Sequence, residues 1–150
     1  MTKDGRHTAY SYDALGNVSA VSYSDGTTEM FTYDANGNLL TSTDRQGLMK
    51  KYRYDKLGRT VEKLLPDGTV TKYEYDANGN LTANISATGC VTAYKYDALG
   101  RTTEIADDDG NTITYRYNSL SQMIVMTDKL GRTTGYEYDA AGNLTAVTAP

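Results

Sequence analysis

Short runs of alternating polar and apolar residues fill the chain, and turn-forming residues separate one run from the next. Three consecutive runs cover residues 27–33, 38–44 and 48–54, and the runs as a group are rich in Thr, Val, Tyr and Ile. Runs of about six to eight residues with this composition are typical of β-strands. No run has the spacing of an amphipathic helix. The pattern therefore predicts an all-β chain.

Aromatic residues follow the same alternation, because they occur in pairs at positions i and i+2. This spacing places both rings of a pair on one face of a strand. The residue between the rings is polar or charged and is expected to face the wetter side of the sheet. Rings of successive pairs are expected to stack as ladders, at roughly 0.2–1 kcal/mol per cross-strand pair. The pairs are Tyr10/Tyr12, Phe31/Tyr33, Tyr52/Tyr54, Tyr73/Tyr75, Tyr94/Tyr96, Tyr115/Tyr117 and Tyr136/Tyr138.

A Tyr-Asp pair closes the aromatic runs and returns every 21 residues, with a Gly three residues after the Asp. A fixed period of this size is the signature of a repeat architecture. The copy at Tyr117 is degenerate, since Asn118 replaces Asp and Ser121 replaces Gly. Residues 1–150 are thus predicted to be a single array of about seven repeats without a second domain. The predicted structural repeat positions are Tyr12, Asp13, Gly16, Tyr33, Asp34, Gly37, Tyr54, Asp55, Gly58, Tyr75, Asp76, Gly79, Tyr96, Asp97, Gly100, Tyr138, Asp139 and Gly142.

Each repeat contains two turns. The first carries Asp-Gly, as at Asp25-Gly26, or an equivalent pair ending in Gly, as at Gln46-Gly47, and the series opens at Asp4-Gly5. Asp-Gly between alternating runs predicts a two-residue type I′ hairpin, which needs positive φ at both central residues. The second turn, as at residues 34–37, begins with Asp and ends with Gly, which predicts a type I turn with a G1 bulge. The chain is therefore expected to form tandem hairpins in a continuous, curved antiparallel sheet.

Composition excludes several classes of protein. The formal net charge is −4 and basic residues are scattered, so a nucleic-acid surface is not expected. The chain has no run of 18 apolar residues and no export signal, so membrane insertion is not expected either. Tyr occurs 14 times, Phe once and Trp never, so Tyr rings must supply much of the buried apolar surface.

Residues with catalytic or metal-binding chemistry are few. His7 is the sole histidine and Cys90 the sole cysteine, and we expect Cys90 to be a small, buried or half-buried strand residue and not a reactive thiol. The Tyr-Asp carboxylates recur in equivalent surroundings, whereas an acid–base pair needs two different environments. They are expected to cap turns. No loop matches an EF-hand, although a weak surface cation site stays open at Asp107–Asp109. We therefore predict no catalytic, metal or cofactor residues, and no enzyme.

The unit Tyr-x-Tyr-Asp-x-x-Gly-Arg/Asn-Leu, most complete at residues 52–59 and 94–101, resembles the YD repeat of the Rhs and teneurin-like proteins. The resemblance covers residues 5–147. It implies hairpins wound side by side into a large hollow shell. In bacterial members it implies an enclosed C-terminal toxin domain or action at the cell surface, and such repeats are linked to carbohydrate binding. The Pro-rich, Asp-Pro-containing segment that closes the family's core is missing here, so part of a wall is expected.

Two functions stay open. The first is structural, as a wall segment of a larger secreted or cell-surface Rhs-like toxin protein. The alternative is a carbohydrate-binding adhesion module that uses exposed Tyr rings, and the absence of Trp counts against it. Expected partners are neighbouring repeats of a longer chain or a second copy at the sheet edges, because unprotected edges invite association.

Overall fold

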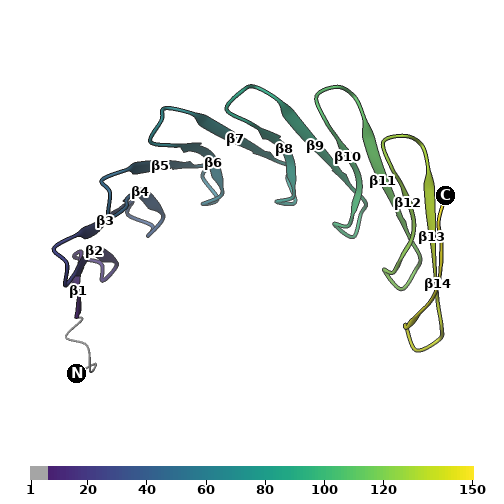
Figure 1. Ribbon diagram of the computed structural model, residues 1–150, viewed down its shortest axis with the longest axis horizontal. Helices are drawn as coiled ribbons and strands as arrows, with labels where there is room; N and C mark the ends of the chain where they lie inside the picture. Colours follow the sequence, from purple (N-terminus) through teal and green to yellow (C-terminus); the bar gives the residue numbers. More distant parts are fainter. Residues whose placement is uncertain (1–6) are drawn as a thin grey trace. The chain divides into compact units, whose positions relative to one another are not determined.

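The computed structural model describes residues 7–150, so the Asp4-Gly5 turn lies outside it. Every element in the described part is a β-strand, each bonded to its neighbours in chain order (Figure 1). The printed strand pairs are all antiparallel, which confirms the predicted all-β repeat fold. The strands are β1 (Thr8–Tyr12), β2 (Val18–Tyr23), β3 (Thr28–Tyr33), β4 (Leu39–Thr43), β5 (Met49–Tyr54), β6 (Thr60–Leu64), β7 (Val70–Tyr75), β8 (Leu81–Ile85), β9 (Val91–Tyr96), β10 (Thr102–Ala106), β11 (Thr112–Tyr117), β12 (Met123–Thr127), β13 (Thr133–Tyr138) and β14 (Leu144–Thr148).

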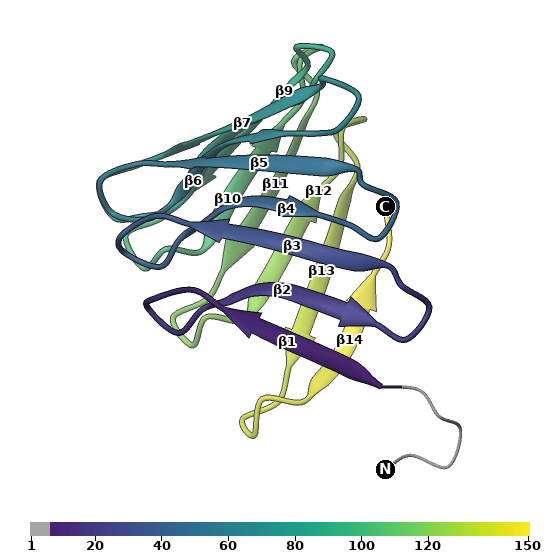
Figure 2. The same ribbon diagram turned by 90° about the vertical axis from the view of Figure 1, so that its left-hand side faces the viewer.

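The chain divides inside β7 into two compact units, Met1–Lys72 and Tyr73–Pro150. In the first unit, β1 to β5 lie side by side as successive rungs (Figure 2). In the second unit, β8 to β14 continue in the same way (Figure 1). The prediction of one undivided array over residues 1–150 stays a prediction.

A β-bulge accompanies the hairpins that close on a Tyr-Asp turn. In the β3–β4 hairpin, Thr32 pairs with Thr41, but the next residue, Tyr33, pairs with Leu39. The same shift occurs beside Tyr12, Tyr54, Tyr117 and Tyr138. A bulge adds one residue to one strand and increases the local right-handed twist. Hairpins closed by the other turn, such as β2–β3, have a regular register.

Both turns of the repeat have the same geometry, so the predicted type I′ hairpin at Asp25-Gly26 is wrong. The N–H of Gly26 donates to the carbonyl of Tyr23, and the N–H of Tyr23 donates to the carbonyl of Thr27, each at 3.0 Å. Gly26 has a φ of 84°, whereas Asp25 is not in the left-handed region. Gly26 is therefore the fourth residue of a type I turn with a G1 bulge, as in the Tyr-Asp turns.

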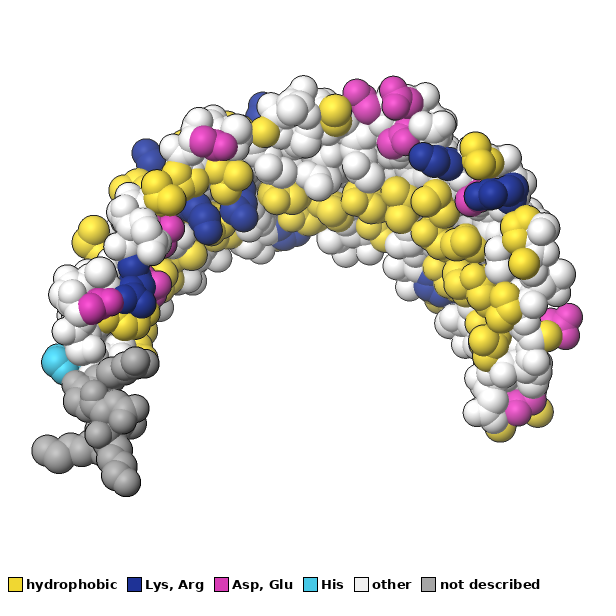
Figure 3. Space-filling view, in the orientation of Figure 1, with side chains coloured by type: hydrophobic (Ala, Val, Ile, Leu, Met, Phe, Trp, Pro, Cys, Tyr) yellow, Lys and Arg dark blue, Asp and Glu magenta, His cyan; other side chains and the backbone are white. Residues whose placement is uncertain are grey.

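Burial is shallow because the described residues form a single layer. No side chain among them is fully buried, and the most buried residues are Val21, Ala83 and Thr43, at 7–8% exposed. The aromatic residues at i and i+2 are half-buried from β3 onward, and the residues between them are exposed, as predicted. Hydrophobic side chains form a band within each unit while charged ones are scattered (Figure 3). Stacking of the rings as ladders stays a prediction.

Candidate functional site

The Tyr-Asp turn is held by its carboxylate. At Asp97, Oδ1 accepts the N–H groups of Leu99 at 2.9 Å and Arg101 at 3.1 Å. Oδ2 accepts Nε of Arg101 at 2.7 Å. The same arrangement recurs at Asp76, where Asn80 takes the place of Arg101. Both oxygens of each carboxylate are thus used inside the turn, which agrees with the capping role expected for Asp at this position.

These hydrogen bonds favour the charged form of the carboxylates. The side-chain hydrogen bond from Asn80 lowers the pKa of Asp76 below the ordinary value of 3.8, and that from Arg101 lowers the pKa of Asp97. Aspartates of the other turn behave alike, since the hydroxyl of Thr27 lowers the pKa of Asp25. The aspartates with a lowered pKa are Asp13, Asp25, Asp34, Asp55, Asp67, Asp76, Asp97, Asp107, Asp128 and Asp139.

We expect the chain to be destabilised by acid. A carboxylate whose pKa is lower in the folded than in the unfolded chain stabilises the fold above the unfolded pKa, about 3.9 for Asp. This stabilisation is lost as the pH falls through the folded pKa. The urea midpoint should therefore hold down to about pH 5 and fall steeply below about pH 4. A midpoint that does not change between pH 7 and pH 2.5 would contradict the prediction.

The degenerate copy supplies a control for this acid prediction. The double variant Asp139→Asn/Asn143→Gln copies the pair found at Asn118 and Gln122 and removes one titrating carboxylate. Its urea midpoint should respond less to acid than that of the unmodified chain.

The tyrosine of the Tyr-Asp pair bonds to the preceding hairpin. The hydroxyl of Tyr96 donates to the carbonyl of Leu81 at 2.8 Å, and that of Tyr54 donates to Leu39 at 2.8 Å. Burial raises the pKa of both hydroxyls. Equivalent bonds join Tyr117 to Thr102 and Tyr138 to Met123. The sequence indicates that a buried Tyr hydroxyl needs a polar partner, but not that the partner is a carbonyl 15 residues earlier in the chain.

Arg101 connects its own turn to the next one. Besides its ion pair with Asp97 at 2.6 Å, its Nη1 donates to the carbonyl of Asn118 at 3.1 Å and to Oγ of Ser121 at 3.2 Å. Its guanidinium lies 4.7 Å from the ring centre of Tyr117. The planar guanidinium can make these contacts together, which the ammonium of a Lys could not. Arg101 thus braces the degenerate turn, a role that sequence analysis missed.

The degenerate turn keeps the usual shape with altered chemistry. Oδ1 of Asn118 accepts the N–H groups of Leu120 and Gln122, each at 3.0 Å. The side-chain amide nitrogen of Asn118 donates to Oε1 of Gln122 at 2.7 Å. The side-chain bond therefore runs in the opposite direction from that in copies with Asp and Asn. Ser121 adopts the left-handed conformation that glycine supplies elsewhere, with a φ of 63°.

Ser121→Gly is expected to stabilise the chain by about 0.5–1 kcal/mol. Gly removes the steric strain of a left-handed L-residue, which outweighs the greater freedom of Gly in the unfolded chain and the loss of one contact to Arg101. Urea denaturation measures the change. Ser119→Gly is the matched control, because Ser119 lies in the same turn without a positive φ and should give no gain. Equal effects of the two variants would contradict the strain argument.

A second contact between repeats occurs at the opposite turn. Arg45 forms an ion pair with Asp25, and its Nε donates to Oγ1 of Thr27 at 2.8 Å. Its guanidinium lies 4.3 Å from the ring centre of Tyr23. Tyr23 in turn donates to Glu29 at 3.0 Å, and this hydrogen bond raises the pKa of Tyr23. Arg side chains thus join successive turns in both units.

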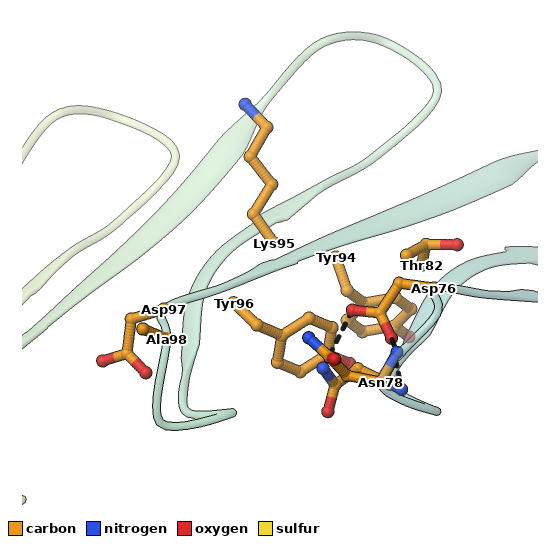
Figure 4. A pocket seen from close by; sticks show the side chains of 9 residues that line it. Asp76, Asn78, Thr82, Tyr94, Lys95, Tyr96, Asp97 and Ala98 are labelled. Carbon is orange, nitrogen blue, oxygen red and sulfur yellow. Dashed lines mark hydrogen bonds between the residues drawn. The ribbon is translucent and has the colours of Figure 1, made fainter.

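An open pocket of the second unit lies between two Tyr-Asp turns and has a volume of about 500 Å³. It is lined by Asp76, Asn78 and Asn80 together with the rings of Tyr94 and Tyr96. Figure 4 shows both rings beside Asp76 and Asn78. The lining offers ring faces, amides, the hydroxyl of Thr82, the ammonium of Lys95, which is paired with Glu104, and two carboxylates already bonded within their turns. Such a lining can bind a hydroxylated ligand but holds no paired nucleophile and base.

The other residues considered from sequence do not form a reactive site. Cys90 is exposed and lies at the exit of a turn before β9, so the prediction of a buried or half-buried strand residue is wrong. Its carbonyl is the acceptor that closes this turn, bonded to the N–H of Ser86 at 2.9 Å. His7 is exposed at the start of the described chain.

The cation site left open at Asp107–Asp109 finds no support. Asp107 bonds to the N–H groups of Asp109 and Asn111, as the other turn aspartates do. Asp108 accepts the N–H of Val91 at 3.3 Å. Over residues 7–150, no three His, Cys, Asp or Glu side chains come together as metal ligands.

A family model describing the teneurin YD-shell matches residues 1–149. The chain belongs to the teneurin YD-shell family. This YD-shell chain resembles the crystal structure of TcdB2-TccC3-TEV with a TM-score of 0.81, at 20% identity over 96% of this chain and 9% of that one. For TcdB2-TccC3-Cdc42 the TM-score is 0.78, at 21% identity over 95% of this chain and 9% of that one.

A Tc holotoxin pore of Photorhabdus luminescens resembles the YD-shell chain more distantly, with a TM-score of 0.56 and 19% identity over 93% of this chain and 11% of that one. The YD-shell chain thus spans about a tenth of these structures. No curated protein matches it. Over residues 7–150, the chain contains no helix that could cross a membrane.

Proposed function

We propose that this chain is a stretch of wall in the β-shell of a longer protein, and that it acts by continuing one antiparallel sheet from hairpin to hairpin. The observation that carries the proposal is that the repeated polar groups are bonded within the wall. Asp97 caps its own turn, and Tyr96 bonds the preceding hairpin. The family and the small share of the similar structures that the chain covers support a longer protein.

In this proposal the repeated Tyr, Asp and Gly are structural positions, and the chain has no catalytic role. Gly79 and Gly100 supply the left-handed residue of the turn, with φ values of 92° and 77°. Each repeat then depends on its own turn and on the hairpin before it, as expected of a repeat array whose stability is a sum over neighbours. Alanine substitutions at these positions should lower stability without removing a separate activity.

We infer further that the completed wall encloses a polypeptide cargo such as a toxin, in a protein that acts outside the cell or at its surface. The likeness to structures of a Tc toxin supports this inference. The test is protease protection of the enclosed segment in the full-length protein that contains this chain. Deletion of residues 76–96 removes one whole 21-residue period and keeps the register. It should shorten the wall and expose the cargo, and unchanged protection would refute enclosure.

Carbohydrate binding is the second candidate, and the pocket beside Tyr94 and Tyr96 is the observation that favours it. A sugar would stack on a ring and bond to the amides of Asn78 and Asn80. A glycan array with the 150-residue chain tests this candidate, with Tyr94→Ala as the variant and circular dichroism as the check of folding. Saturable binding that Tyr94→Ala removes would favour this function, and an empty array would leave the structural role.

A further inference from the structure

The open pocket of the second unit lies where an arginine guanidinium lies one repeat later. Arg101 extends from its own turn onto the next hairpin, where its Nη1 donates to the carbonyl of Asn118 at 3.1 Å. Its guanidinium lies 4.7 Å from the ring centre of Tyr117. One period of 21 residues earlier, the corresponding residues are Asn80, Asp97 and Tyr96, and all three line the pocket. The second unit therefore contains a filled and an open copy of one arrangement.

Asn80 reaches only part of the way that Arg101 does. Nδ2 of Asn80 donates to Oδ2 of Asp76, the aspartate of its own turn, at 2.8 Å. Nε of Arg101 donates to Oδ2 of Asp97 at 2.7 Å, so the two nitrogens hold their turns in the same way. Arg101 continues beyond Nε with a carbon and two further nitrogens, whereas the amide of Asn80 ends there. The shorter side chain leaves the space open between its turn and the next.

The lining of this pocket suits a planar cation. Tyr96 offers the ring face that Tyr117 offers to Arg101. The carbonyl of Asp97 accepts the N–H of Gly100 at 3.0 Å, and a carbonyl oxygen has a second lone pair. Oδ1 of Asn80 is another acceptor on this side, 3.6 Å from a Cβ built on Gly100. A ring face with two acceptors favours a ligand that is positively charged and donates hydrogen bonds.

The charges around the pocket agree with this ligand. Hydrogen bonds lower the pKa of Asp76 and of Asp97, so both carboxylates are charged at neutral pH. Lys95 is the one cation among the residues that line the pocket, and its Nζ is paired with Glu104 at 2.8 Å. Figure 4 shows Lys95 pointing away from both rings. A cation that enters beside the rings therefore meets no repulsion from Lys95 at close range.

We propose that this pocket binds the guanidinium of an arginine side chain that another polypeptide presents. The bound group takes the place of the part of Arg101 that Asn80 lacks, so it stacks on Tyr96 and donates to the carbonyl of Asp97. A guanidinium fits better than an ammonium, because it is planar and carries several donors in a fixed fork. This inference goes beyond the wall role and does not depend on it.

An equivalent pocket of the first unit gives the proposal a selectivity. Its lining includes Asn36 and Asn38 of one Tyr-Asp turn and Lys56, Leu57 and Gly58 of the next. Lys56 holds the position that Ala98 holds in the second unit. Two like charges about 6 Å apart in water lower the affinity about threefold. The pocket beside Lys56 should therefore bind a guanidinium more weakly than the pocket beside Ala98.

An NMR titration tests the proposal. N-acetylarginine methylamide is added to the isotope-labelled 150-residue chain, and the backbone amide signals of Gly100 and Gly58 are followed. Titration to about 50 mM covers the millimolar dissociation constants expected of a small ligand at an open site. Gly100 should shift saturably, and Gly58 should respond with at least about threefold lower affinity. The matching citrulline compound has the same shape without the charge and should not shift Gly100.

Two variants locate the site. Asn80→Arg supplies a guanidinium from the chain itself, with the residue type found at Arg59 and Arg101, so it should abolish the shift of Gly100 and keep a folded spectrum. Asn143→Arg is its matched control, because it adds the same charge at the same position of another repeat and should leave the shift unchanged. Ala98→Lys copies Lys56 and should weaken binding about threefold.

Four results would overturn the proposal. They are no shift of Gly100 at the highest concentration, an equal shift with the citrulline compound, an equal shift with N-acetyllysine methylamide, and binding that survives Asn80→Arg. Equal shifts with the lysine compound would show a site for any cation. Failure of guanidinium binding would leave the wall role and the sugar candidate as they are, since protease protection and the glycan array test those separately.

Discussion

Replacement of Tyr96 by alanine is expected to lower the free energy of unfolding by about 2–3 kcal/mol. The substitution removes a half-buried ring and the hydroxyl that donates to the carbonyl of Leu81 at 2.8 Å. The ring loss accounts for most of this energy, and a hydrogen bond to a carbonyl contributes about 1 kcal/mol. Urea unfolding followed by circular dichroism measures the change.

Two variants separate the parts of the Tyr96 effect. Tyr96→Phe keeps the ring and should cost only about 1 kcal/mol, the share of the hydroxyl. Tyr12→Ala is the matched control, since Tyr12 holds the same place in the first repeat but is 61% exposed. It should cost much less than Tyr96→Ala. Equal costs at Tyr12 and Tyr96 would show that contact with the preceding hairpin is not what makes the tyrosine important.

The strands could be predicted from sequence because their signals are local and repeated. Predicted segments 27–33 and 38–44 agree with β3 and β4 to within one residue at each end. Because side chains of a strand alternate between its two faces, the sequence predicts that both rings of a pair lie on one face of the sheet. The rings on either side of Thr32 and of Lys95 are half-buried, whereas Thr32 and Lys95 are exposed, which confirms this prediction. Each signal recurs in every repeat, so a weak indication in one copy is supported by the others.

The turn type and the burial of Cys90 could not be predicted from one dipeptide, because the residues on either side decide the length of the turn. Asp25-Gly26 taken alone suggests a two-residue loop. The actual turn is longer, because Tyr23 and Thr27 close it and Gly26 is its fourth residue. The same longer turn places Cys90 at the exit and outside β9, which is why it is exposed.

Contacts between repeats could not be predicted from local patterns. The bond from Tyr96 to Leu81 depends on how far one hairpin lies from the next, which composition does not give. The position of Arg101 holds Asn in four other copies but also Arg59 and Gln122, so the residue type alone gave no signal for its contacts. Its contacts with Asn118 and Ser121 fall on the one copy that lost both Asp and Gly. We infer that drift in one turn is tolerated because the preceding turn supports it.

Gly79→Val is expected to lower the free energy of unfolding by about 2 kcal/mol. Gly79 has a φ of 92°, and a Cβ built there meets no atom within 4 Å. The cost therefore comes from the backbone alone, because a β-branched residue is a steric outlier in the left-handed region. Urea unfolding again gives the change, with circular dichroism to confirm that the remaining strands are retained.

Ala77→Val is the matched control for Gly79→Val. Ala77 is exposed in the same turn and does not have a positive φ, so valine adds the same bulk without the strain. Its effect should stay below about 0.5 kcal/mol. If both variants lost the same stability, bulk at the turn would be responsible. If neither lost any, the turn would tolerate a change of conformation, and the recurrence of glycine at the end of the Tyr-Asp turn would need another physical reason.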